Sequence, residues 1–278
     1  MSDVGPAVEP LSTDPFAAVP DSTFNTLEGW TWIGCYGGYY LSSDLLDQQG
    51  FEHGFFTRRW QGREPDELVT YLSAGTTVHR PQQVHSAVVL DASQADRAPW
   101  PEADGLVSDR GSQSLWVCGA DCTPVLLADP TSGHVAACHA GWRGVAGGIL
   151  REAITRLEQL GAQRDQLLVA LGPAVNGINY QVQQVVAGQV LASLPAPEQL
   201  PLDPQMLTGV VLDDPKPGHC RLDIRAAATV QLQAAGIQAN RISRCPLCTV
   251  AAPALFHSWR RDQVKAVQWS GIVSQAAI

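Results

Sequence analysis

The sequence predicts a mixed α+β fold, an α/β protein in the broad sense, with mixed β-sheets covered by helices. Strand-like segments outnumber helical ones, and tight turns join them as often as helices do, which disfavours a purely parallel sheet. Hydrophobic residues make up 45% of the 278 residues, which excludes wholesale disorder. A chain of this length can bury roughly 75% of its unfolded surface, so it supports a large core.

The N-terminal segment differs in composition from the rest of the chain. Residues 1–26 are rich in Pro, Asp and Ser and show no hydrophobic periodicity. We therefore predict a flexible N-terminal arm over 1–26, followed by a single domain over 27–278.

Three short strand-like segments follow the arm. Aromatic and β-branched residues from Trp30 to Ser42 surround a Gly-Gly pair, a pattern typical of a hairpin. A second strand runs through residues 53–58 and ends at Arg58. The third covers residues 83–90 and carries His85 near its start.

The densest apolar stretch predicts a strand, a turn and a returning strand. Residues 114–129 form a mostly apolar run that is interrupted by Pro124, which cannot donate a hydrogen bond to a neighbouring strand. Residues 129–133 have the composition of a turn. The returning strand covers residues 134–142.

Helical periodicity appears in three later segments. Apolar residues from Ile149 to Leu160 share one helical face, and a glycine follows as the stop signal. A second helix is predicted over 182–194. A third begins after Asp223 as its N-cap and ends before Gly236.

Charge and composition exclude several classes of protein. The net charge of −9 argues against a nucleic-acid partner. No apolar run reaches the ~20 residues of a membrane span, so no membrane partner is expected. The first twenty residues lack Lys and Arg and do not resemble a secretory signal. We expect a cytoplasmic protein that is a monomer or a homodimer.

The predicted strand pair brings one cysteine near one histidine. If Asp129 lies opposite His134 across the turn, then His139 lies opposite Pro124. Cys122 is two residues further along the same face, at a diagonal distance of ~7–8 Å or less between Cβ atoms. A register shift of one residue would place the two side chains on opposite faces.

A cysteine beside a histidine has three interpretations. The imidazole can take the thiol proton and leave a nucleophilic thiolate. Thiolate and imidazole are also preferred zinc ligands, and a catalytic zinc needs a third protein ligand, for which His85 is the natural candidate. The third interpretation is core packing, because the spacing of these residues is not a local zinc signature.

Two arginines are candidate phosphate ligands, because a guanidinium matches two phosphate oxygens. For Arg58 the alternative is a surface ion pair with Glu64 or Asp66. Arg143 precedes a helix N-terminus, where anions are favoured. Its alternative role is packing against Trp142.

Two further features carry side chains that are often functional. Asp121 flanks Cys122, so in a strand it points to the opposite face and is better suited to anchor backbone than to act as a base. Cys245 and Cys248 form a C-x-x-C motif, but no second pair follows. We expect them to bind no metal.

Seven short segments resemble, in the same order, motifs of the YfiH-type family. This family is known as the laccase-domain or multicopper polyphenol oxidase family, and also as purine nucleoside phosphorylases. The specific pair is A-D-C-x-P-V followed by H-A-G-W-R-G. The segments are H-G-F-F-T-R (53–58), Q-V-H (83–85), A-D-G-L-V (103–107), A-D-C-T-P-V-L-L (120–127), H-A-G-W-R-G (139–144), L-G-P-A-V (171–175) and S-W-R-R-D (258–262).

The resemblance implies an α/β/β/α sandwich and a zinc site formed by His85, Cys122 and His139. It implies phosphorolysis of adenosine, inosine and methylthioadenosine to the base and ribose 1-phosphate, with adenosine deamination as a second activity. Arg58, Arg143 and Asp121 are then the candidate groups for substrate and phosphate. The alternatives are a copper-dependent polyphenol oxidase, a metal-free Cys-His hydrolase and an inactive binding module. Seven histidines are few for the several copper centres of a laccase.

The chain departs from the family pattern at two places. The segment after Arg58 reads RWQGREPDEL where the family usually has a Gly-Gly-Val-Ser loop and a longer Asn-containing segment. The C-terminal Thr-Gly-Arg element is replaced by AVQWSGI. Both departures concern substrate specificity, and neither touches the three implied metal ligands.

Overall fold

The computed structural model describes residues 27–35, 38–195, 207 and 209–275. The predicted arm over 1–26 lies outside these residues. The single domain predicted for 27–278 stays a prediction.

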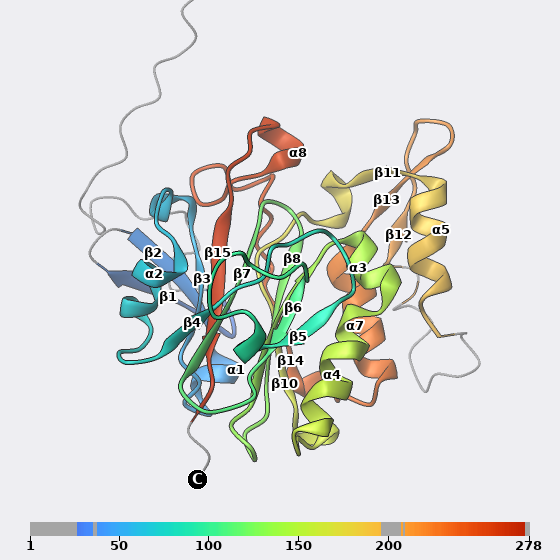
Figure 1. Cartoon of the computed structure of the whole chain (residues 1–278). Coiled ribbons are helices and arrows are strands. Elements are labelled where there is room, and N and C mark those ends of the chain that lie inside the picture. Colours follow the sequence, from blue (N-terminus) through green and yellow to red (C-terminus); the bar gives the residue numbers. More distant parts are fainter. Residues whose placement is uncertain (1–26, 36–37, 196–206, 208, 276–278) are drawn as a thin grey trace, which may run out of the picture.

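Two six-stranded mixed sheets form the centre of the molecule (Figure 1). The first sheet has the spatial order β1 (Trp30–Cys35), β2 (Gly38–Ser43), β3 (His53–Phe56), β15 (Gln268–Val273), β7 (Gln113–Gly119) and β4 (Thr77–His79). The second has the order β14 (Ile242–Arg244), β10 (Leu168–Leu171), β8 (Thr123–Ala128), β9 (Val135–Ala140), β6 (Gly105–Val107) and β5 (Val89–Asp91). Each sheet combines antiparallel pairs with parallel ones, namely β4–β7, β10–β14 and β5–β6.

The remaining elements surround these sheets. A small antiparallel sheet has the order β11 (Gln181–Gln183), β13 (His219–Leu222) and β12 (Val211–Leu212). The helices are α1 (Asp44–Asp47), α2 (Pro65–Leu68), α3 (Trp142–Gly147), α4 (Ile149–Gln159), α5 (Gln184–Ala192), α7 (Ile224–Ala234) and α8 (Trp259–Asp262). In Figure 1, α4 and α7 lie on one side of the sheets and α2 on the other.

The buried side chains define four layers. Leu126 and Ala128 of β8 pack against side chains of the first sheet, such as Val117. Val125 and Leu127, on the opposite face of β8, pack against α4 and α7. The outer face of the first sheet is covered by a cluster of mostly aromatic side chains, against which Leu68 of α2 also packs. This confirms the α/β/β/α sandwich, and it explains why β8 is apolar on both faces.

Several predicted elements are confirmed. β1 and β2 pair antiparallel as the predicted hairpin. The helix predicted over 149–160 is α4, and Gly161 follows it with φ of 96°. The side chain of Asp223 caps α7 by accepting a hydrogen bond from the backbone N–H of Ala226. The helix predicted over 182–194 begins later, because residues 181–183 form β11 before α5.

Two strand predictions need correction. The strand predicted over 83–90 is largely a loop, and only its last residues belong to β5. Here the backbone N–H groups of residues 84–86 bind the Asp104 carboxylate, so they do not pair with a strand.

The run over 114–129 forms two strands in different sheets, β7 and β8, and the break lies at residues 120–122. Pro124 lies within β8, and its carbonyl accepts a hydrogen bond from Gly172.

Among the described residues, no helix is both long enough and apolar enough to span a membrane. The expected cytoplasmic location and the expected monomer or homodimer stay predictions.

Candidate metal centre

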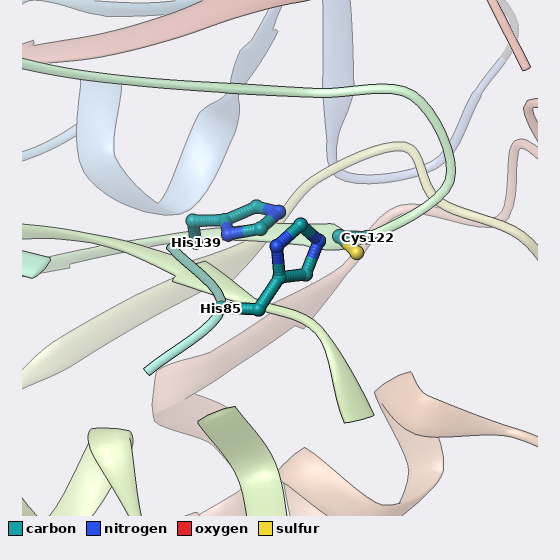
Figure 2. A group of neighbouring side chains, drawn as sticks. All are labelled: His85, Cys122 and His139. Atoms are coloured by element: carbon teal, nitrogen blue, oxygen red, sulfur yellow. The ribbon is translucent and has the colours of Figure 1, made fainter. Parts of the chain in front are cut away.

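The strand register predicted from the turn is confirmed. β8 and β9 pair antiparallel with Pro124 opposite His139, and Cys122 lies immediately before β8. The Cys122 thiol and one imidazole nitrogen of each of His85 and His139 all lie within 4.8 Å of one another. Figure 2 shows the three side chains converging, with both rings near the sulfur.

His85 reaches the cluster from a loop. Its backbone has φ of 61°, a conformation that is uncommon for residues other than glycine. Its ring centroid lies 4.9 Å from that of His139, and the ring planes meet at 79°. The loop conformation therefore directs the side chain of His85 across the end of β9.

Asp104 positions both His85 and His139 through hydrogen bonds. The sequence analysis did not single out this residue. Its buried carboxylate accepts hydrogen bonds from the backbone N–H groups of Val84, His85 and Ser86, and from the Ser86 hydroxyl. It also accepts a hydrogen bond of 2.8 Å from Nδ1 of His139. This bond fixes the His139 tautomer and leaves Nε2 as the free ligand atom. The only sequence signal was an Asp-Gly pair inside the A-D-G-L-V segment.

The electrostatics of the cluster favour ionised groups. Burial raises the pKa of Asp104, but hydrogen bonds from His139 and Ser86 outweigh this and lower it to about 2. Burial also raises the pKa of Cys122, while the nearby His139 and His85 lower it to about 6. Burial lowers the pKa of His139, whereas Cys122 and Asp104 raise it to about 9. The site therefore stabilises the thiolate form of Cys122, which is the form that binds metals.

Two glycines leave room for the sulfur and the rings. A methyl group at Gly141 would lie 2.8 Å from Sγ of Cys122 and 3.6 Å from the ring of His85. A methyl group at Gly119 would lie 3.3 Å from the carbonyl oxygen of Cys122. The φ of Gly141 is −75°, which any residue can adopt. Its lack of a side chain therefore serves the close approach of Cys122.

The donor set fits a zinc ion. One thiolate and two imidazoles are ligands that zinc prefers, and three protein ligands are typical of catalytic rather than structural zinc. The second ring nitrogen of His139 is bound by a carboxylate, as in many zinc sites. Among the described residues, this is the one group of three or more His, Cys, Asp or Glu side chains that is close enough to hold a metal.

The predicted phosphate ligands differ in their surroundings. Arg58 does not pair with Glu64, which binds Arg80, or with Asp66. Its Nη1 donates to the carbonyl of Pro253 at 2.7 Å. The exposed guanidinium of Arg143 lies 4.4 Å from the ring centroid of Trp142, so the predicted packing contact exists.

Asp121 acts as an anchor. One carboxylate oxygen accepts a hydrogen bond from the hydroxyl of Thr249, and the other accepts one from the backbone N–H of Arg260, both at 2.6 Å. Both oxygens are thus occupied by donors of the protein, and Asp121 ties Cys122 to the C-terminal segment that carries α8.

Comparisons with known proteins define the class. The model of the multi-copper polyphenol oxidoreductase laccase family matches residues 64–274, about three quarters of the chain. The chain belongs to this family.

Relatives agree with this assignment. The chain is 40% identical over 258 residues to the purine nucleoside phosphorylase slr1573 of Synechocystis sp., covering 88% of this chain and 97% of the relative. The crystal structure of YlmD from Geobacillus stearothermophilus superposes with a TM-score of 0.74 at 26% identity, covering 85% of this chain and 96% of that one. The crystal structure of the hypothetical protein YfiH from Bacillus licheniformis superposes with a TM-score of 0.71 at 26% identity, with the same coverage of both chains. These matches confirm the YfiH-type resemblance and the fold.

We expect Asp104→Asn to weaken zinc binding by about 10–100-fold, the range typical of partners that orient a metal ligand. The amide cannot accept all the hydrogen bonds that the carboxylate accepts, so the loop that carries His85 and the ring of His139 both lose an anchor. Zinc affinity can be measured by competition with a chromophoric chelator. The control is Asp109→Asn, because Asp109 also accepts hydrogen bonds, from Ser93 and Gln113. Equal affinity in the wild type and Asp104→Asn would contradict the role of Asp104.

Gly141→Ala should weaken zinc binding by at least about tenfold while stability stays within about 1 kcal/mol of the wild type, because the new methyl group displaces the sulfur without straining the backbone. The matched control is Gly188→Ala in α5, where a methyl group meets no atom within 4 Å. It should keep zinc affinity and gain about 0.5–1 kcal/mol. The same chelator titration and thermal unfolding test both variants. Full zinc affinity in Gly141→Ala would refute the steric argument.

The double variant Cys245→Ser, Cys248→Ser should keep its zinc. Cys245 is buried in the core, and Cys248 accepts hydrogen bonds from Asn176 and Asn179. We expect a stability loss of about 1–3 kcal/mol from the buried hydroxyls, with one zinc per chain. Metal analysis checks this against Cys122→Ser, which should lose the metal. Zinc loss in the double variant would show that the C-x-x-C motif does bind it.

Proposed function

We propose that this protein is a zinc-dependent purine nucleoside phosphorylase. It would cleave adenosine, inosine and methylthioadenosine to the free base and the sugar 1-phosphate, and deaminate adenosine at the same site. The observation that carries the proposal is the convergence of His85, Cys122 and His139 in a chain 40% identical to a relative of that name. Purine nucleosides and phosphate are accordingly the proposed partners.

The chemistry divides between the metal and the chain. His85, Cys122 and His139 would hold a zinc ion, and that ion would supply a Lewis acid facing the substrate. Asp104 keeps the proton of His139 on Nδ1, so that Nε2 stays directed to the cluster.

Phosphorolysis makes a second demand on the chain. The bond between C1′ of the sugar and the purine nitrogen breaks, a bond from a phosphate oxygen to C1′ forms, and the base leaves with a proton. The phosphate must be held beside the sugar, and guanidinium groups suit this task. Arg58 and Arg143 are the groups proposed from the sequence.

One geometric feature favours a metal-free hydrolase as the second candidate. Asp104, His139 and Cys122 follow one another in the order of a catalytic triad, and Cys122 has a lowered pKa of about 6. A nucleophilic cysteine would work after metal removal and would lose activity on alkylation. A zinc enzyme would lose activity with its zinc and regain it when zinc returns.

A multicopper oxidase is less well supported. A laccase mechanism uses several copper centres, whereas the part of the chain that the structure describes holds a single cluster of possible ligands. Metal analysis of protein produced without added metal separates one zinc from several coppers.

The decisive assay is cleavage of inosine by the zinc-loaded protein. Cleavage should require phosphate and yield ribose 1-phosphate. His85→Ala and His139→Ala should each lower phosphorolysis and adenosine deamination together by more than about 100-fold, because both activities share the metal. This loss exceeds the roughly 10–100-fold loss that is typical when a residue that orients a metal ligand is replaced. His219→Ala is the control, because His219 lies in β13 of the small sheet and its Nδ1 contacts the carbonyl of Pro217. Cleavage that continues unchanged without phosphate, or no turnover of any purine nucleoside, would overturn the proposal.

A further inference from the structure

A third arginine, Arg260, is anchored to the residue that precedes Cys122. Arg260 is in α8, the short helix at the top of Figure 1. Its backbone N–H donates to Asp121, the residue before Cys122, at 2.6 Å. Asp121 has φ of 103°, and its carbonyl accepts a hydrogen bond from Val175. The position of Arg260 is thus fixed relative to the candidate metal ligand.

The guanidinium of Arg260 is exposed and stacks on an aromatic ring. Its Cζ lies 4.9 Å from the ring centroid of Tyr180. Arg143 is arranged in the same way on Trp142, the residue that follows Gly141. Such stacking restrains a flat guanidinium while its N–H edge stays free for a ligand, so little conformational entropy is lost on binding.

The two arginines act on the same tyrosine as Cys122 and Asp121. Burial raises the pKa of Tyr180 to about 12, and Cys122 and Asp121 raise it too, whereas Arg260 and Arg143 act to lower it. All four groups therefore influence the same hydroxyl. Within the ranges that the structure describes, the guanidinium of neither Arg260 nor Arg143 has a carboxylate oxygen within 4 Å.

The neighbouring arginines are already engaged. Arg58 donates to the carbonyl of Pro253. Burial lowers the pKa of His257, and the charge of Arg58 lowers it further. Arg261 donates to the backbone carbonyls of three residues and pairs with Asp262.

A chain with a net charge of −9 repels a dianion, so a phosphate needs unpaired cations at its binding site.

From this arrangement we propose that Arg260, assisted by Arg143, is the principal ligand of inorganic phosphate at the metal site, in place of Arg58. The proposal rests on the proposed phosphorylase function and names the residue that holds its nucleophile. The guanidinium of Arg260 binds two phosphate oxygens through its free edge, and the charge of Arg143 neutralises the remaining negative charge. Arg58 then supports the loop around Pro253.

The test measures phosphate binding separately from turnover. Titration of zinc-loaded protein with inorganic phosphate, by calorimetry or ³¹P NMR, gives a dissociation constant for each variant. Arg260→Gln should raise this constant at least about tenfold, because it removes a charge-assisted contact. Arg260→Lys should restore part of the affinity, since it keeps the charge and loses the two-pronged contact. Arg164→Gln is the matched control, because Arg164 is an exposed arginine paired with Glu158. Zinc content should be equal in all variants.

Turnover supplies the second readout. In Arg260→Gln the KM for phosphate should rise at least about tenfold, while the KM for inosine stays within about twofold of the wild type. Phosphate binding that depends on Arg260 in a protein that cleaves no nucleoside would support this inference and sink the phosphorylase proposal.

Three results would overturn the inference. The first is equal phosphate affinity in the wild type and Arg260→Gln. The second is a larger loss in Arg58→Gln than in Arg260→Gln. The third is a loss in Arg260→Gln that affects inosine 5′-monophosphate but not inorganic phosphate, because Arg260 would then bind the phosphoryl group of a nucleotide.

Discussion

The geometry of the candidate metal centre depends on the buried carboxylate of Asp104. A buried charge is costly unless hydrogen bonds satisfy it, and this one receives donors from three consecutive backbone N–H groups, a hydroxyl and an imidazole. The backbone donors set the loop that carries His85, and the imidazole is that of His139. One side chain therefore fixes two of the three candidate ligands at once.

The sandwich provides a rigid frame for this arrangement. β8 and β9 are covered on one face by the first sheet and on the other by α4 and α7, so their positions are determined by close packing on both sides. The reactive groups lie where these strands end: Cys122 precedes β8, and His139 is near the end of β9. Gly141 follows directly, and its lack of a side chain admits the sulfur.

The charge near the candidate site differs from the charge of the chain as a whole. The chain is acidic overall, yet the surroundings of Cys122 include two exposed arginines stacked on aromatic rings. This local contrast suits an anionic co-substrate better than a phenol. It agrees with the relatives that are named purine nucleoside phosphorylases, and it differs from the oxidoreductase activity in the name of the family.

Local sequence patterns were enough to predict four features: the hairpin of β1 and β2, the helix α4 with its glycine stop, the cap of α7, and the register that brings Cys122 near His139. The family motifs added His85. The role of Asp104 and the contacts of Arg58 and Arg260 become visible only in the folded chain. A carboxylate that binds backbone N–H groups about twenty residues away leaves no periodic signal, and it turned a predicted strand into a loop. Whether an arginine is engaged or free depends equally on chain segments far away in sequence, such as Pro253 for Arg58 and Tyr180 for Arg260.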